Sequence, residues 1–93
     1  MKIQQVEWPL PVRKKLLSFR SKHFTPEETY DFIIQTILET EDILMNPVYG
    51  KMYIEETGKY TGFMRLVIRR FRIYVKQIGT KAIVVGVKFP GEK

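Results

Sequence analysis

The spacing of apolar residues changes once along this chain of 93 residues, and that change constrains the fold more than any other feature. Over Phe24–Met45 the apolar side chains recur with the 3.6-residue period of a helix. Over Phe63–Phe89 the chain instead consists of short runs rich in β-branched and aromatic residues, which favour strands. The sequence therefore predicts an α+β domain in which helices pack on one face of a sheet.

Two helices are expected before most of the strands. The longer begins at Thr25–Glu28, where Thr-Pro-Glu-Glu forms a capping box with proline at the first helical position. It ends before Pro47, because the residue that precedes a proline avoids the helical conformation. A shorter helix is expected over Val12–Arg20 from the spacing of its apolar residues. The core-facing stripe predicted for the longer helix comprises Tyr30, Ile33, Ile34, Ile37, Leu44 and Met45.

The predicted sheet is small, mainly antiparallel and four-stranded, with both helices on one face. Residues 48–62 are expected to be a connector, with room for a short extended segment at 51–56. Alternation along the third strand puts Arg72, Tyr74 and Lys76 on the face away from the helices, where Arg65 is also expected. The four strands are predicted at Ile3–Trp8, Phe63–Ile68, Phe71–Gln77 and Lys81–Phe89.

Length and composition predict a single domain over residues 1–93. The chain has no cysteine, and its single histidine, His23, is expected in a turn between the helices. No apolar run approaches the roughly 20 residues that span a bilayer. The segment Met1–Glu7 lacks the plan of a signal peptide. A cytoplasmic location without membrane contact is therefore expected.

The charges are segregated along the sequence. The net charge is +6, and six of the ten acidic residues lie between Glu27 and Asp42. From Thr57 to Lys93 there are nine basic residues against one acid. Such segregation indicates an anionic partner, of which nucleic acid is the commonest and an acidic protein is the rival.

Few kinds of catalytic chemistry are open to this composition. With one histidine and no cysteine, nothing in the sequence supports Ser-His-Asp or Cys-His catalysis. The glycines at 50, 58 and 62 fit no phosphate-binding loop, and no metal or cofactor is expected. The basic sheet face remains, because arginine binds phosphate with a planar fork and tyrosine stacks on unpaired bases. The residues alone leave open whether this face binds a partner or is simply solvated.

Four segments in fixed order resemble the RelE/ParE superfamily of toxins from type II toxin–antitoxin systems. They are Asn46–Lys51 (Asn-Pro-x-x-Gly-Lys), Tyr60–Leu66 (Tyr-x-Gly-x-x-Arg-Leu), Phe71–Val75 (Phe-Arg-Ile-Tyr-Val) and Ile83–Val87 (Ile-Val-Val-Gly-Val). The resemblance implies the helix–helix–sheet order predicted above. It also implies a cognate antitoxin that covers the basic surface, and one of two activities. RelE-like members cut mRNA on the ribosome without a metal, whereas ParE-like members inhibit DNA gyrase.

The resemblance also implies roles for particular residues. Arg72 matches the arginine that RelE-like nucleases place on the scissile phosphate, and Arg65 falls where RelE has a catalytic lysine. A second such lysine position falls on Val67, which is apolar. Glu55 is similar in placement to the general-base glutamate of the YoeB branch. The nucleic-acid-binding residues expected beside this catalytic set are Tyr74, Lys76, Arg69, Arg70, Lys51 and Lys88.

The sequence departs from the nuclease pattern at its end. Nuclease members usually carry a histidine or tyrosine after the last strand, whereas Phe89–Lys93 (Phe-Pro-Gly-Glu-Lys) contains neither. Tyr74 substitutes as proton donor only if its hydroxyl reaches the site. Three hypotheses follow: a ribosome-dependent mRNA endonuclease, a ParE-like gyrase inhibitor, or a non-catalytic basic RNA-binding module of the same fold.

Overall fold

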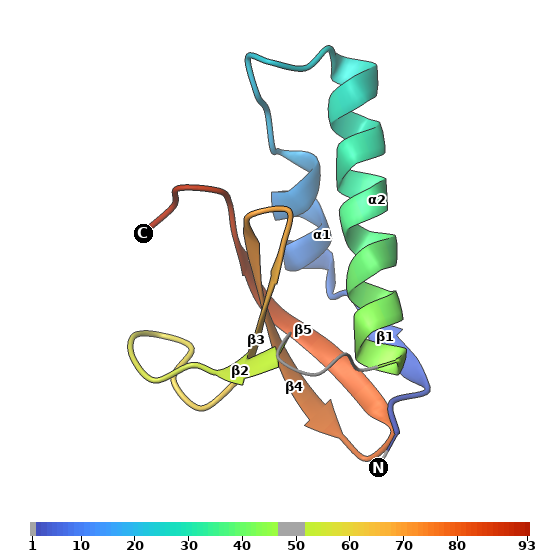
Figure 1. Ribbon diagram of the computed structural model, residues 1–93, viewed down its shortest axis with the longest axis vertical. Coiled ribbons are helices and arrows are strands. Elements are labelled where there is room, and N and C mark those ends of the chain that lie inside the picture. The colour runs from blue at the N-terminus through green and yellow to red at the C-terminus, as the bar shows by residue number, and fades with distance from the viewer. Residues whose placement is uncertain (1, 47–51) are drawn as a thin grey trace.

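A computed structural model describes residues 2–46 and 52–93 of the chain, which form an α+β fold with two helices and a mixed sheet (Figure 1). Lys51 and Pro47, which the sequence analysis singled out, lie outside the described residues. The elements in chain order are β1 (Gln5–Glu7), α1 (Leu10–Leu17), α2 (Pro26–Met45), β2 (Met52–Ile54), β3 (Met64–Ile68), β4 (Phe71–Ile78) and β5 (Lys81–Lys88).

The sheet has five strands, so the prediction of four was wrong. The strand order is β1-β5-β4-β3-β2, with β1 parallel to β5 and the other neighbours antiparallel. The added strand is β2, an edge strand of three residues within the predicted connector. Three residues are too few to show a strand period, and β2 exists because its backbone pairs with β3.

The helix α2 begins at its predicted capping box. The Glu28 backbone N–H donates to Thr25 Oγ1 at 3.1 Å, and the Thr25 N–H donates to Glu28 Oε1 at 2.8 Å. Its buried face differs from the predicted stripe, because Tyr30 is 56% exposed. Three threonines take the buried positions, and each hydroxyl donates to the carbonyl four residues earlier, so that no donor is lost on burial. They are Thr29, Thr36 and Thr40.

The helix α1 begins two residues earlier and ends three residues earlier than predicted. Pro11 fits its first turn, where a missing N–H costs nothing. Beyond Ser18 the chain leaves the helix, and Phe19 packs among the aromatic rings of Phe32, Phe71 and Phe89 instead. The histidine expected in the turn that follows is exposed there.

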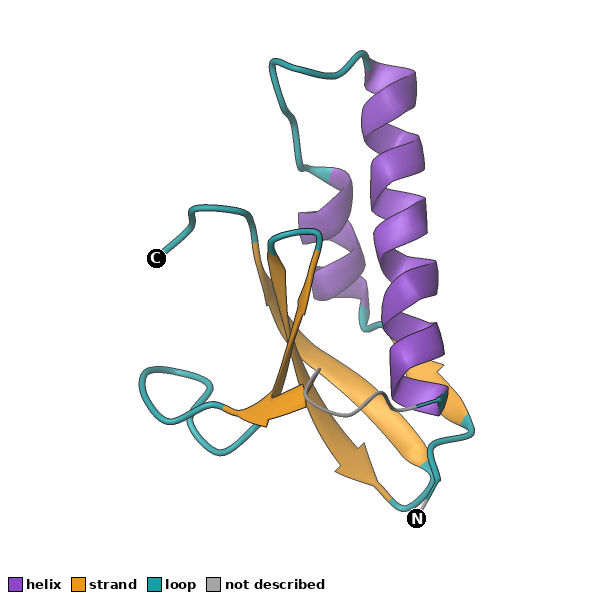
Figure 2. Cartoon of the chain, viewed as in Figure 1, coloured by secondary structure: helices purple, strands orange, loops and turns teal. Residues whose placement is uncertain are grey.

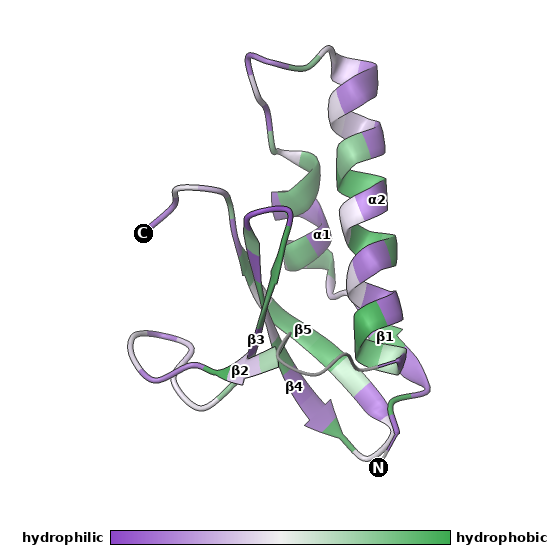
Figure 3. Cartoon of the chain, viewed as in Figure 1, coloured by the Kyte–Doolittle hydropathy of each residue, from purple (hydrophilic) through white to green (hydrophobic). Residues whose placement is uncertain are grey.

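Both helices lie on the same side of the sheet (Figure 2). The core between them and the sheet is apolar, and Figure 3 shows hydrophobic colour along β5 and on part of α2. Its completely buried members include Leu16, Leu44, Leu66, Ile73 and Val84. Within the described part of the chain, no helix covers the opposite face of the sheet, which is called the helix-free face below.

Candidate nucleic-acid interface

Strand register brings the predicted arginines together on the helix-free face. Arg65 on β3 pairs with Tyr74 on β4, and Arg72 on β4 pairs with Lys88 on β5. Residues directly opposite each other share a face, as do residues two apart on one strand. The intervening Ile73 is fully buried against the helices, so Arg65, Arg72, Tyr74 and Lys88 lie on the other side. This placement agrees with the alternation of the sequence.

Glu55 joins this group from the end of β2. Its carboxylate Oε1 accepts a hydrogen bond from Arg65 Nη1 at 3.3 Å, and the two side chains are 15% and 33% exposed. The backbone of Glu55 also bonds to the far end of the following loop: its N–H donates to the Phe63 carbonyl, and its carbonyl accepts from the Gly62 N–H. These backbone bonds hold Glu55 in place at the end of β2, beside Arg65. The Arg65 guanidinium also lies 5.7 Å from the centre of the Tyr53 ring.

The Tyr74 side chain is completely buried, although it lies on the helix-free face. Its hydroxyl makes no hydrogen bond of good geometry within the described residues. Burial raises the pKa of Tyr74 above 10.0, and the nearby Glu55 carboxylate raises it further, while Arg72 and Arg65 lower it. The phenol is therefore neutral at neutral pH. In this conformation Tyr74 is not the exposed stacking surface that the sequence analysis expected.

Tyr60 covers Tyr74, and the sequence analysis did not assign it a role. The two rings are stacked with centres 4.3 Å apart and planes 14° from parallel. The Tyr60 ring also lies against Gly86 on β5, where any Cβ would overlap it. A glycine inside an apolar strand is the sequence signal for such a close approach. Lys59 Nζ lies 5.6 Å from the centre of the Tyr60 ring.

The remaining predicted residues are spread over three places. Lys76 is exposed on the same face of β4, and Lys88 is half-buried beside Arg72. Arg69 lies at the helix side, where its Nε donates to Glu39 Oε2 at 3.1 Å on α2. Arg70 is exposed at the tip of the β3–β4 turn. These two arginines therefore do not extend the group around Arg72.

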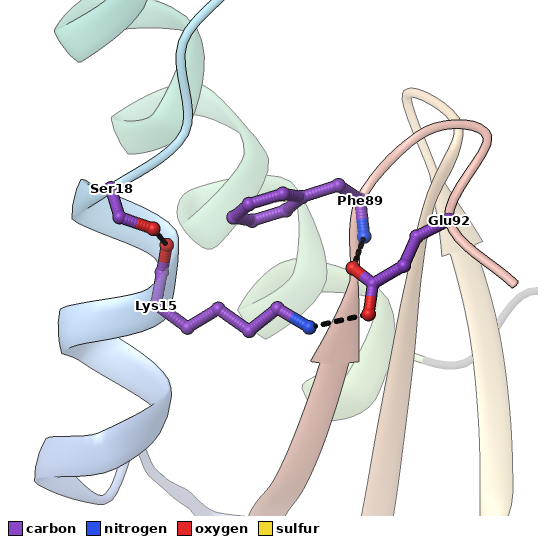
Figure 4. Close-up of polar contacts among 4 residues, drawn as sticks. All are labelled: Lys15, Ser18, Phe89 and Glu92. Carbon is purple, nitrogen blue, oxygen red and sulfur yellow. Dashed lines mark hydrogen bonds and ion pairs between the residues drawn. The ribbon is translucent and has the colours of Figure 1, made fainter.

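The chain after β5 folds back toward α1. Lys15 Nζ donates to Glu92 Oε2 at 2.8 Å, and the other carboxylate oxygen accepts the Phe89 N–H at 2.9 Å (Figure 4). These bonds, led by that from Lys15, lower the pKa of Glu92 below 4.5. The last acid of the chain is thus tied to a lysine and a backbone N–H.

Other kinds of site are not found within the described parts of the chain. In residues 2–46 and 52–93, no three histidine, aspartate or glutamate side chains gather in a way that could hold a metal ion. Among the same residues, no helix is both long and apolar enough to cross a membrane. Comparison of the chain with protein-family models, curated proteins and solved structures finds no match in any of the three.

Proposed function

We propose that this protein is a RelE/ParE-like toxin that cleaves ribosome-bound mRNA in the cytoplasm, and that a cognate antitoxin neutralises it. The observation that carries the proposal is the convergence of Glu55, Arg65, Arg72 and Tyr74 from three strands on the helix-free face. A carboxylate, two guanidinium groups and a protonated phenol are the parts that RNA cleavage by the ribose 2′-hydroxyl requires. Helix–helix–sheet order and the four sequence segments support the family resemblance.

The proposed reaction uses each of these groups once. The Glu55 carboxylate takes the proton of the ribose 2′-hydroxyl. The 2′-oxygen forms a bond to phosphorus while the bond to the 5′-oxygen breaks, which yields a 2′,3′-cyclic phosphate and a 5′-hydroxyl end. Arg72 and Arg65 stabilise the negative charge that develops on the phosphorane oxygens. The neutral Tyr74 hydroxyl, which lies near Glu55, Arg65 and Arg72, supplies the proton to the leaving 5′-oxygen.

The test is expression of the protein without its antitoxin, followed by primer extension on cellular mRNA. We expect discrete cuts with the wild type and a loss of roughly 10²–10³-fold in cleavage with Arg72→Ala, since an electrostatic contact to the transition state is removed. The matched control is Arg13→Ala, which removes an exposed arginine from the outer side of α1. Unchanged translation arrest with folded Arg72→Ala protein would contradict the proposal.

One observation favours a second function, inhibition of DNA gyrase. The segment after β5 contains no histidine or tyrosine, and its one carboxylate side chain, Glu92, is tied to Lys15. The phenol of Tyr74 is covered by Tyr60. A ParE-like inhibitor needs a binding surface and no proton donor. This function predicts intact mRNA together with loss of supercoiling by purified gyrase when excess protein is added. Normal supercoiling under those conditions would exclude it.

A further inference from the structure

A groove lies beside the stacked rings of Tyr60 and Tyr74, between α1 and the loop that carries Tyr60. Its volume is about 300 Å³, at the lower end of the range for small-ligand sites and of a size for one nucleotide. It is lined by Val85–Val87 on β5, by Val12 and Lys15 on α1, and by Lys59 and Tyr60. Among residues 2–46 and 52–93, no acidic side chain lines it.

Tyr60 lies between this groove and Tyr74. Because the two rings are stacked, one face of the Tyr60 ring is occupied by the Tyr74 ring. The side chain of Tyr60 is only partly buried, and it lines the groove together with Lys59. An aromatic ring backed by a second ring and flanked by a cation is the arrangement on which unpaired bases stack.

The charges at the groove favour a backbone phosphate. Lys59 is exposed on one side, and Lys15 is held on the other by Glu92 at 2.8 Å and by the Phe89 ring, whose centre lies 5.1 Å from Nζ. These contacts position Lys15 before any ligand binds, which lowers the cost of ordering it. The Glu92 carboxylate offsets part of its charge, so Lys59 is the stronger attraction for an anion.

We propose that this groove holds one unpaired RNA nucleotide adjacent to the nucleotide bound at Arg72. Its base stacks on the outer face of Tyr60, and its phosphate lies between Lys59 and Lys15. The inference rests on the proposed function for the identity of the ligand, and it makes Tyr60 a binding residue of the substrate site rather than only a cover for Tyr74.

The experiment measures binding of fluorescein-labelled 2′-O-methyl RNA, which lacks the attacking hydroxyl, by fluorescence anisotropy. A single abasic position is moved along the oligonucleotide. With the wild-type protein, we expect one abasic position to weaken binding by roughly tenfold, since stacking of one base contributes that much or more. We call this loss of affinity the abasic penalty. We expect it to disappear in Tyr60→Leu and to be retained in Tyr60→Phe.

The controls separate a binding role from a structural one. Tyr30→Leu removes an exposed tyrosine far from the groove lining and leaves the penalty unchanged. Should Tyr60→Leu fail to fold, Lys59→Ala tests the same groove, because losing one phosphate contact lowers the salt slope of binding by about 0.7. An unchanged abasic penalty in folded Tyr60→Leu, or displacement by polyglutamate as effective as by RNA, overturns the inference.

Failure of this inference is distinguishable from failure of the proposed function. If Arg72→Ala abolishes cleavage while Tyr60→Leu keeps the abasic penalty, the groove assignment is wrong and the nuclease assignment stands. If the penalty depends on Tyr60 but no variant or wild-type protein cuts mRNA, the protein binds RNA at the groove without cleaving it.

Discussion

Tyr74 has a hydroxyl that lies near Glu55 and two arginines, without a hydrogen bond of good geometry in the described structure. Because its pKa in the folded protein is raised above 10.0, folding favours the neutral phenol. The resulting stabilisation is fully present below pH 10.0 and is lost as the pH rises through the folded pKa. We expect Tyr74 to ionise at higher pH than an unperturbed tyrosine, which an ultraviolet absorbance titration of wild type and Tyr74→Phe measures.

The same substitution tests the cost of that buried hydroxyl. Removing a buried group that lacks a partner is close to neutral, or stabilising by up to about 1 kcal/mol, near pH 7. Urea unfolding of Tyr74→Phe is therefore expected to give a free energy equal to or slightly above that of the wild type, while mRNA cleavage falls. A fall of more than about 1 kcal/mol in the free energy of unfolding would instead mean that the Tyr74 hydroxyl makes a hydrogen bond in solution.

Part of the candidate site could be predicted from the sequence. Period-two alternation is enough to put Arg72, Tyr74 and Lys76 on one face, because a strand leaves no other choice. The position of Tyr60 over Tyr74 could not be predicted in this way, since it depends on where a loop places the Tyr60 ring relative to β4 and β5. Gly86 was the one available signal, and it indicates a close approach without naming what approaches.

At the scale of elements, the β3–β4 hairpin turns through two arginines in the left-handed region. Arg69 has φ 51° and Arg70 has φ 72°, where tight hairpins usually carry Asn-Gly. Each such residue costs about 1–2 kcal/mol, partly offset by the smaller chain entropy that it loses on folding. We expect Arg70→Gly to raise the free energy of unfolding by about 0.5–1 kcal/mol in urea titrations.

Arg69 is left in place in that test because its contact with Glu39 lies on the helix side. Glu39→Gln is the comparison, and as the loss of an exposed ion pair it is expected to change stability by less than about 1 kcal/mol. A lower stability for Arg70→Gly would mean that the Arg70 side chain contributes more than its backbone strain costs.

The elements differ in how far the sequence determines them. The start of α2 follows from Thr25 and Glu28 alone, because a capping box is local chemistry. Its buried face does not, since threonines compete with apolar residues for the core once their hydroxyls bond back to the helix. The sequence predicted β2 only as room for a short extended segment at 51–56, because a strand of three residues depends on pairing with a partner ten or more residues away.

At the scale of the whole molecule, Glu92 joins the segment after β5 to α1 through Lys15. Both side chains are about one-third exposed, so solvent screening limits the pair to under about 1 kcal/mol. The pKa of Glu92 is lowered, chiefly by Lys15 and then by the Phe89 N–H. Its contribution is therefore present above pH 4.5 and is lost as the pH falls through the folded pKa.

Glu92→Gln tests this connection. At pH 7 we expect the variant to unfold at slightly lower urea concentration than the wild type, and the difference to shrink as the pH is lowered from 4.5 toward 3. Lys93→Gln, which removes an exposed charge from the adjacent position, serves as control. A difference between Glu92→Gln and wild type that persists unchanged at low pH would show that the carboxylate charge is not its cause.

The parallel pairing of β1 with β5 has a consequence for when this protein can acquire its native state. Gln5 pairs with Lys81, so the partner of the first strand is made only after all the intervening residues have been synthesised. Because β5 lies between β1 and β4, β1 joins the sheet only through β5. Such non-local pairing is slow, because loop-closure entropy is lost before the contacts form. Glu55, Arg65 and Arg72, in contrast, come from the end of β2, from β3 and from β4, which pair with near neighbours in the chain, so this surface forms without waiting for β1 to reach β5.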